Sequence, residues 1–299
     1  MGADVRTARG NQKLFVCLAA VALGACGSAD DATDLTPPAA GTGGAVEAAP
    51  EQVPAAPAAP ATVGLEPRNP VIEQQLAYGE SADRNLIGYL AMPADAVEPQ
   101  PGLLVVHESA GLDEDIRVLT RRLAGEGFVV LAADLFGGEV AETPEAVQRL
   151  AARVTQSPEA TLGNLRQGYE YLSRYALAPK VGALGWSLGG TWALQSALSH
   201  AGELDAVVVY YGQVVRDRDQ LGALSAPLLG LFGAEDPSIP LADIQAFRGT
   251  LNDLGKDAEV RIYSRVGHAF ASPGASGYDP ESAEDAWERT VAFLNRTLR

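Results

Sequence analysis

The chain has 299 residues, a formal net charge of −16 and 47% hydrophobic residues, so it can bury a substantial core. The excess of acidic groups excludes a nucleic-acid partner, because such binding relies on lysine and arginine to displace counterions from phosphates. Its two cysteines, Cys17 and Cys26, both lie near the N-terminus, and no Cys/His cluster has metal-ligand spacing. We therefore expect no structural zinc site.

Residues 1–25 have the features of a lipoprotein-type signal peptide. Three basic residues precede the run "LFVCLAAVALGA" (14–25), which is too short to span a bilayer but fits the apolar region of a secretory signal. The run leads into Leu23-Gly24-Ala25-Cys26, which resembles a bacterial lipobox. We predict that Cys26 is lipidated and anchors an exported protein to a membrane, on its periplasmic or cell-surface side. Cleavage without lipidation, which would release a secreted protein, is the open alternative.

The chain then changes composition twice. Residues 26–67 combine prolines with alanine, glycine and acidic residues, a composition that predicts a disordered tether. Residues 68–299 hold apolar runs separated by amphipathic segments, which predicts one folded domain of the α/β class. The segments "VIEQQLAY" (71–78) and "NLIGYLAM" (85–92) resemble an antiparallel strand pair.

After this pair, buried strands and helices alternate. The strands are predicted at 102–107, 127–134, 180–186, 205–211, 226–232 and 258–263; the helices are predicted around 116–123, at 144–155, 159–175, 188–200 and 240–254, and from about 281. Continuous apolar runs such as "GLLVVH" are typical of strands buried on both faces. The alternation predicts a mostly parallel sheet with helices on both faces, and sites in such sheets form at the C-terminal ends of strands.

A candidate nucleophile follows one of these strands. In "VGALGWSLGG" (181–190) the order is strand, Gly-x-Ser-x-Gly, helix, which is the context of a nucleophile elbow. Gly185 and Gly189 leave room for a tight turn around Ser187. The N-terminus of the following helix would favour negative charge developing beside this serine. An ordinary turn is the alternative reading of the pentad alone.

A serine nucleophile needs a general base, and the chain has three histidines. His200 lies at the far end of the helix that begins at Ser187, so it cannot reach it. His107 ends an earlier strand, where an oxyanion loop would lie. His268 follows the last strand in "SRVGHAF", and Asp236 follows the preceding strand in "LFGAEDP". The chain order Ser187, Asp236, His268 is that of the α/β-hydrolase triad.

Four segments together resemble the dienelactone hydrolase family: "VVHESAGLDEDIRVLTRRLAGEGFVVLAADLFGG" (105–138), "VGALGWSLGGTWAL" (181–194), "LFGAEDPSIP" (231–240) and "YSRVGHAFASP" (263–273). The resemblance covers residues 70 to 299 in order. It implies an α/β-hydrolase fold in which Ser187, Asp236 and His268 stand at the nucleophile, the acid and the base.

The resemblance also implies further site residues. Glu108 stands at the glutamate that contacts the resting nucleophile in the family, and the backbone N–H groups of Ser109 and Leu188 stand at the oxyanion hole. The family uses an arginine to hold a substrate carboxylate, which has no clear counterpart here. Many members carry cysteine in the elbow, whereas this chain has serine, which must lose its proton to the base during attack.

The segment between Tyr211 and Ala226 is too short to hold a lid domain. We therefore expect an open pocket, lined by Trp186, Tyr210 and Tyr211 unless these aromatic side chains pack in the core instead.

These observations predict an exported serine hydrolase that cleaves small carboxylic esters or lactones without a metal or organic cofactor. Two alternatives stay open. A peptidase or acyltransferase would use the same triad, and a surface lipoprotein that only binds a ligand would use the same scaffold. The oligomeric state is not predicted.

Overall fold

The computed structural model of the protein describes residues 65–81 and 84–299. The predicted signal peptide, the predicted lipidation site Cys26 and the predicted tether up to residue 64 lie outside the described residues. Within the described ranges, no helix combines the length and the apolar character needed to cross a membrane.

The strands and helices follow the predicted alternation. The strands are β1 (Val71–Ser81), β2 (Arg84–Pro93), β3 (Gly102–Val106), β4 (Val129–Ala133), β5 (Val181–Trp186), β6 (Ala206–Tyr210), β7 (Leu228–Gly233) and β8 (Ala258–Tyr263). The helices are α1 (Glu114–Gly125), α2 (Pro144–Gln156), α3 (Pro158–Glu170), α4 (Leu188–Ser199), α5 (Arg218–Gly222), α6 (Leu241–Asp253) and α7 (Pro280–Leu298).

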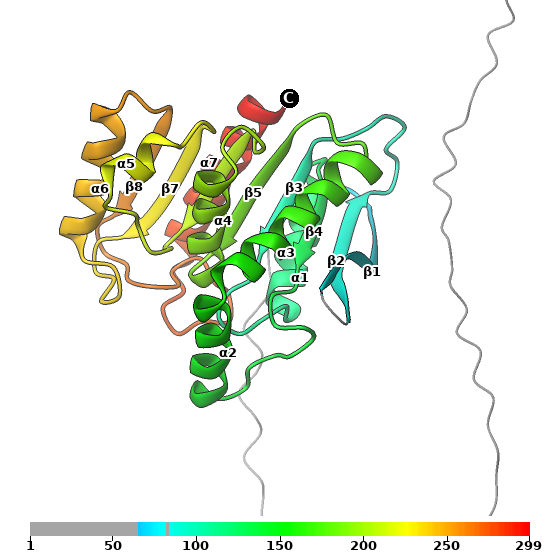
Figure 1. The fold of residues 1–299 in the computed structure, drawn as a ribbon, viewed down its shortest axis with the longest axis horizontal. Helices are drawn as coiled ribbons and strands as arrows, with labels where there is room; N and C mark the ends of the chain where they lie inside the picture. Colours follow the sequence, from blue (N-terminus) through cyan, green and yellow to red (C-terminus); the bar gives the residue numbers. More distant parts are fainter. Residues whose placement is uncertain (1–64, 82–83) are drawn as a thin grey trace, which may run out of the picture. The chain divides into compact units, whose positions relative to one another are not determined.

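The strands form one sheet in the order β1-β2-β4-β3-β5-β6-β7-β8 (Figure 1). β2 is antiparallel to β1 and to β4, and the other neighbours are parallel. Every residue of β3 to β7 is buried, whereas β8, an edge strand, alternates between half-buried and exposed positions until its buried last residue, Tyr263. The predicted α/β-hydrolase fold, a mostly parallel sheet with helices on both faces, is confirmed.

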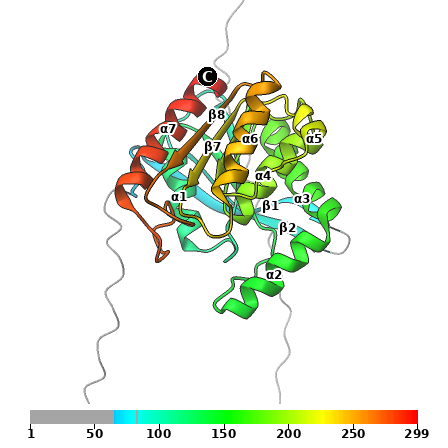
Figure 2. The ribbon, with the colours of Figure 1, turned by 90° about the vertical axis from the view of Figure 1, so that its left-hand side faces the viewer.

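Helices cover the two faces of the sheet (Figure 2). α1 and α7 lie on one face, and α3, α4 and α6 lie on the other. α7 turns Trp287, Leu294 and Leu298 into the core, at the spacing of three or four residues expected of an amphipathic helix. The carboxyl ends of the parallel strands therefore meet at one edge of the sheet, between the two helical layers.

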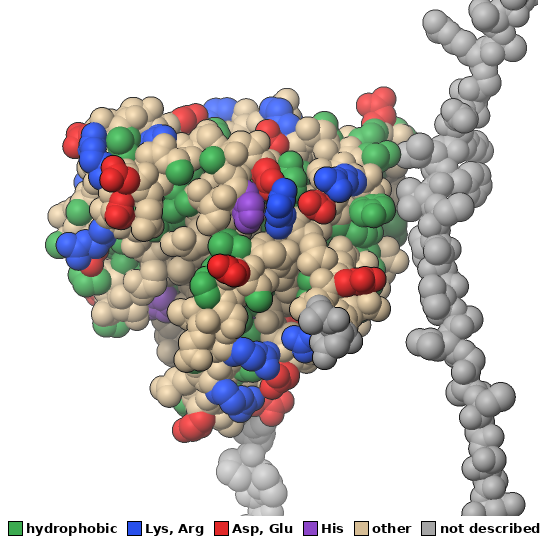
Figure 3. Space-filling view, viewed as in Figure 1, with side chains coloured by type: hydrophobic (Ala, Val, Ile, Leu, Met, Phe, Trp, Pro, Cys, Tyr) green, Lys and Arg blue, Asp and Glu red, His purple; other side chains and the backbone are tan. Residues whose placement is uncertain are grey.

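Two local features differ from the prediction. The predicted helix over 159–175 ends as an α-helix at Glu170 and continues as a π-helical turn, Tyr171–Tyr175. Between Tyr211 and Ala226 the structure holds only the five-residue helix α5, which the sequence pattern did not indicate. On the face in Figure 3, acidic and basic side chains are intermixed rather than segregated.

Candidate active site

Ser187 lies on the tight turn between β5 and α4. Its backbone adopts a positive φ (φ 52°, ψ −117°), a conformation that costs about 1–3 kcal/mol in a residue other than glycine. The neighbouring backbone holds it there: the Ser187 N–H donates to the Tyr210 carbonyl at 2.9 Å, and its carbonyl accepts from the Thr191 N–H at 3.1 Å. The turn therefore has the strained geometry of a nucleophile elbow.

Glycines make this turn possible. A Cβ on Gly190 would lie 2.9 Å from the carbonyl oxygens of Gly185 and Tyr210, and one on Gly189 would clash with the Val106 carbonyl at the end of β3. Because position 189 carries no side chain, α4 begins directly against the end of β3. Ser187 thereby comes to lie beside the loop that follows β3.

Ser187, His268 and Asp236 form one hydrogen-bonded chain. The Ser187 Oγ lies 2.8 Å from His268 Nε2, and His268 Nδ1 lies 2.7 Å from Asp236 Oδ2. With Nδ1–H donating to the carboxylate, Nε2 is free to accept the serine proton. The second carboxylate oxygen, Oδ1, accepts the Ser238 N–H at 2.7 Å, which fixes the orientation of Asp236. The Asp236 side chain is 1% exposed and that of His268 is 31% exposed, so the base faces solvent while the acid does not.

The acid and the base meet because β7 and β8 are parallel neighbours. The loops after these strands touch where the Glu235 N–H donates to the Val266 carbonyl at 3.0 Å. Gly233 allows the two loops to come this close, because a Cβ at this position would overlap the carbonyl groups of Val266 and Gly267. Asp236 and His268, which are 32 positions apart in the sequence, are thus brought within one hydrogen bond of each other.

The two predicted oxyanion donors lie at the same edge. Leu188 begins α4, and Ser109 lies in the loop after β3, against which α4 packs. Among the hydrogen bonds of residues 65–81 and 84–299, neither the Ser109 N–H nor the Leu188 N–H has an acceptor. Both donors are therefore available to a negatively charged oxygen near Ser187.

Glu108 contacts different groups from those implied by the resemblance. Its carboxylate accepts from the Tyr211 hydroxyl at 3.4 Å and from Ser272, while the resting Ser187 hydroxyl bonds to His268. Burial raises the pKa of Glu108 to about 7, and the nearby negative charge of Asp113 adds to the shift. The expected contact between Glu108 and the resting nucleophile is thus replaced by contacts with Tyr211 and Ser272.

Only one of the three predicted pocket aromatics contacts the triad. The Tyr211 ring lies edge-on to the His268 ring with centroids 5.1 Å apart. Tyr210 instead hydrogen-bonds to the Ala286 carbonyl and the Thr290 hydroxyl of α7, and Trp186 stacks on it at 5.3 Å. Trp186 and Tyr210 are each 1% exposed and Tyr211 is 0% exposed, so the expectation that they line an open pocket is corrected: all three pack in the core.

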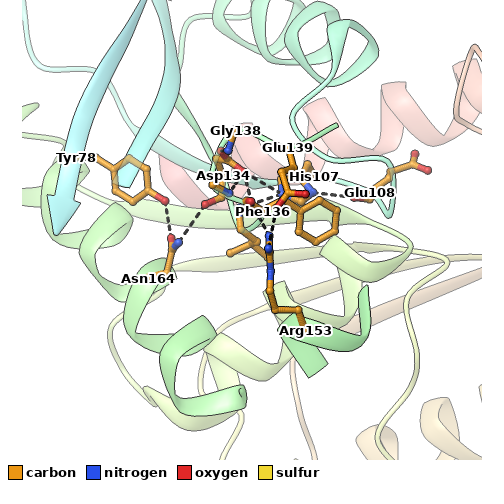
Figure 4. Close-up of polar contacts among 11 residues, drawn as sticks. Tyr78, His107, Glu108, Asp134, Phe136, Gly138, Glu139, Arg153 and Asn164 are labelled. Atoms are coloured by element: carbon orange, nitrogen blue, oxygen red, sulfur yellow. Dashed lines mark hydrogen bonds and ion pairs between the residues drawn. The ribbon is translucent and has the colours of Figure 1, made fainter. Parts of the chain in front are cut away.

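His107 belongs to a separate buried cluster (Figure 4). Its Nδ1–H donates to the Glu108 carbonyl at 2.7 Å, and its Nε2 accepts from the Leu135 N–H at 3.0 Å. Burial lowers the pKa of His107, so the ring is neutral and has no nitrogen free for catalysis. His200 caps the C-terminus of α4, as predicted from its position in the helix.

Two groups near the site escaped the sequence reasoning. Ser272 hydrogen-bonds to Glu108, and Asp115 at the start of α1 accepts from the Gly274 backbone, so the loop that carries His268 is attached to the other side of the site. No periodicity or motif marks either residue, because both contacts join loops distant in sequence. In the part of the chain that the structure describes, no cluster of histidine, cysteine, aspartate and glutamate could hold a metal ion.

Comparison with known proteins shows what this chain is similar to. The model of the Dienelactone hydrolase family matches residues 86–298. A Yersinia pestis protein, named provisionally as a carboxymethylenebutenolidase, is 32% identical over 226 residues, which cover 71% of this chain and 84% of that protein.

Among solved structures, too, this chain is similar to dienelactone hydrolases. The crystal structure of a provisionally named dienelactone hydrolase from Klebsiella pneumoniae subsp. pneumoniae has 30% identity and a TM-score of 0.70, covering 76% of this chain and 100% of the other. A dienelactone hydrolase-like promiscuous phosphotriesterase from metagenomic libraries has 22% identity and a TM-score of 0.70, covering 77% of this chain and 99% of the other; at that identity only the fold is shared.

Proposed function

Since the chain belongs to the dienelactone hydrolase family and is therefore a carboxylic ester or lactone hydrolase, we propose that Ser187 is its nucleophile and forms an acyl-enzyme with small substrates. The observation that supports this most strongly is the unbroken chain from the Ser187 hydroxyl through His268 to Asp236, with links of 2.8 and 2.7 Å. In such a chain the serine oxygen becomes a strong nucleophile because the histidine accepts its proton during the attack.

In the first half of the reaction, the Ser187 oxygen attacks the substrate carbonyl carbon while its proton passes to His268 Nε2. The carbonyl oxygen becomes negatively charged and accepts hydrogen bonds from the Ser109 and Leu188 N–H groups. Asp236 stabilises the imidazolium that forms. When the tetrahedral intermediate collapses, His268 gives its proton to the leaving alkoxide.

In the second half, a water molecule takes the place of the alcohol. His268 accepts a proton from this water as it attacks the acyl carbon, and then returns a proton to the Ser187 oxygen when the acid leaves. With a lactone, the alkoxide remains attached to the acyl group, so a single hydroxy acid is released at the end.

The test is hydrolysis of p-nitrophenyl acetate, p-nitrophenyl butyrate and a panel of small lactones. We expect Ser187→Ala to lower kcat by about 10³-fold or more, because alanine has no hydroxyl to attack the carbonyl and carry the acyl group. Ser173→Ala is the matched control, since its hydroxyl bonds only to the Glu170 carbonyl on a helix distant in sequence from the elbow, and it should keep full activity. Full activity of Ser187→Ala would contradict the proposal.

We also propose that the protein is exported and lipidated on Cys26, on the strength of the basic N-terminus, the short apolar run and the Leu-Gly-Ala-Cys sequence. Metabolic labelling with a fatty-acid analogue tests this. The label should be lost in Cys26→Ser and kept in Cys17→Ser, which removes the other cysteine of the chain. Equal labelling of both variants, or no label on the wild type, would contradict lipidation at Cys26.

A further inference from the structure

A cavity of about 380 Å³ lies away from the triad. The loop after β4 (134–140), the strand β2 and the helix α1 enclose it, and neither Ser187 nor His268 lines it. Its volume falls at the lower end of the range of small-molecule sites. The mechanism proposed above gives it no role.

Two arginines line this cavity without an acidic partner. Arg84 comes from the start of β2 and Arg117 from α1, and neither forms an ion pair with any acid among residues 65–81 and 84–299. The Arg117 Nε is buried and finds no hydrogen-bond acceptor in the same ranges. An unsatisfied buried donor of this kind costs about 1–3 kcal/mol, so an acceptor entering the cavity would be favoured.

The two acidic side chains that line the cavity, Asp134 and Glu139, already have hydrogen-bond or ion-pair partners. The Asp134 carboxylate accepts from the backbone N–H groups of Phe136, Gly137 and Gly138, as Figure 4 shows in part. Glu139 pairs with Arg149 and Arg153 of α2. With Glu139 neutralised by these ion pairs, the charged lining that remains is Arg84, Arg117 and Asp134, which carry a net positive charge of about one.

The remaining walls are partly apolar. The apolar part comprises Leu86, Ile87, Leu112, Leu135 and Val140, and the uncharged polar side chains Gln75, Asn85 and Asn164 complete the lining. A Cβ on Gly137 would overlap the Arg84 guanidinium, so this glycine allows the guanidinium to lie flat against the loop. The cavity therefore combines two cationic side chains with a partly apolar wall.

We propose that this cavity is a second ligand site, which binds an organic monocarboxylate with a small apolar body through Arg84 and Arg117. A guanidinium presents paired N–H donors that match the two oxygens of a carboxylate, and the leucine-lined walls take the hydrocarbon part. A single negative charge balances the net charge of the lining. Ligand binding in this cavity does not require Ser187 to be the nucleophile of the reaction.

The experiment measures the binding of benzoate, with benzamide as its uncharged counterpart, by ligand-observed NMR and by the shift of the melting temperature. The proteins are the wild type, Arg84→Gln, Arg117→Gln and the matched control Arg174→Gln, which removes one charge from a side chain that is 70% exposed outside the cavity. Hydrolysis of p-nitrophenyl acetate is followed in parallel, since neither cavity arginine belongs to the catalytic machinery.

We expect the wild type and Arg174→Gln to bind benzoate but not benzamide, and each cavity variant to bind benzoate about tenfold more weakly with unchanged hydrolysis. Binding should also weaken as the salt concentration rises. Absence of benzoate binding in the wild type, or equal binding in all four proteins, would overturn the proposal. Should Arg117→Gln fail to fold, the exposed Arg84 still provides the decisive variant.

Discussion

Two histidine–aspartate pairs lie at the C-terminal edge of the sheet. His268 and Asp236 follow β8 and β7, and His107 and Asp134 follow β3 and β4. In the first pair the ring nitrogen and the carboxylate are 2.7 Å apart, whereas in the second the closest atoms are 3.8 Å apart. The residue types and their positions after parallel strands are alike, but the hydrogen bonds that each pair makes are different.

The two pairs differ in whether the histidine keeps a ring nitrogen free to transfer a proton. His268 uses Nδ1 for its aspartate, keeps Nε2 for Ser187 and is 31% exposed. His107 is fully buried with both nitrogens bonded to the backbone, and Asp134 binds three backbone N–H groups instead of the ring. A histidine and an aspartate are thus placed to transfer protons in one pair and hold loops together in the other. The exposure of the ring and the partner of each ring nitrogen decide between these two roles.

The largest expected effect is on the exposed pair. Asp236→Asn should lower kcat for p-nitrophenyl acetate by about 10³- to 10⁴-fold, because the amide neither holds the required tautomer of His268 nor stabilises its charged form. Steady-state kinetics measures this, with circular dichroism to show that the fold is kept. A loss of less than about tenfold in a folded variant would mean that the His268–Asp236 pair is no more important for the reaction than the buried pair.

On the buried pair, the corresponding change should affect stability. Asp134→Asn removes a charged acceptor from three backbone donors, which we expect to lower the free energy of unfolding by about 2–4 kcal/mol. Urea unfolding gives this value, and kcat per folded molecule should stay within about threefold of the wild type. A fall in kcat as large as that of Asp236→Asn would instead assign Asp134 to the reaction.

Glu108 connects the two pairs, since its carbonyl accepts from His107 and its carboxylate bonds to Tyr211 at the triad. Its pKa is raised to about 7 in the folded state, so between about pH 4.5 and 7 the folded protein binds more protons than the unfolded chain. The contribution of Glu108 to stability therefore falls as pH rises through this window.

Glu108→Gln lacks this titration. Its free energy of unfolding relative to the wild type should rise by roughly 1–3 kcal/mol between pH 5 and pH 8, as measured by urea unfolding at both pH values. Glu142→Gln, on the loop before α2, is a matched control that should show no such change. The same difference at both pH values would mean that Glu108 does not titrate in this range.

The smallest effect is expected for the Tyr211 hydroxyl. Its hydrogen bond to Glu108 is long, at 3.4 Å, and the contact with His268 is made by the ring. Tyr211→Phe keeps the ring, so kcat should change by less than about threefold, while Tyr211→Ala should lower it further by loosening His268. If Tyr211→Phe lost as much activity as Tyr211→Ala, the hydroxyl rather than the ring would be the important group.

The sequence predicted the elements that depend on local pattern. Buried strands with continuous apolar runs, such as β3 and β5, and the amphipathic α7 fall within a few residues of their predicted bounds. The brief helix α5 was not predicted, because five residues are too few to show a period. The π-helical end of α3 could not be predicted either, since it differs from an α-helix by one hydrogen-bond step rather than by pattern.

Predictions for the site succeeded where chain order determines position and failed where packing does. Ser187, Asp236 and His268 follow strands whose order in the sheet brings them together, and the structure joins them. Trp186 and Tyr210 end strands beside the site, but α7 covers one face there and takes their side chains into the core. The partners of Glu108 depend on two loops, and no local pattern carries that information.

The central claim is that Ser187 carries the acyl group during turnover. Rapid quenching of the wild type with p-nitrophenyl butyrate, followed by peptide mass spectrometry, tests it most directly. The account predicts a butyryl adduct on the peptide that holds Ser187, and no such adduct in Ser187→Ala. An adduct on any other residue, or turnover by Ser187→Ala at the wild-type rate, would contradict it.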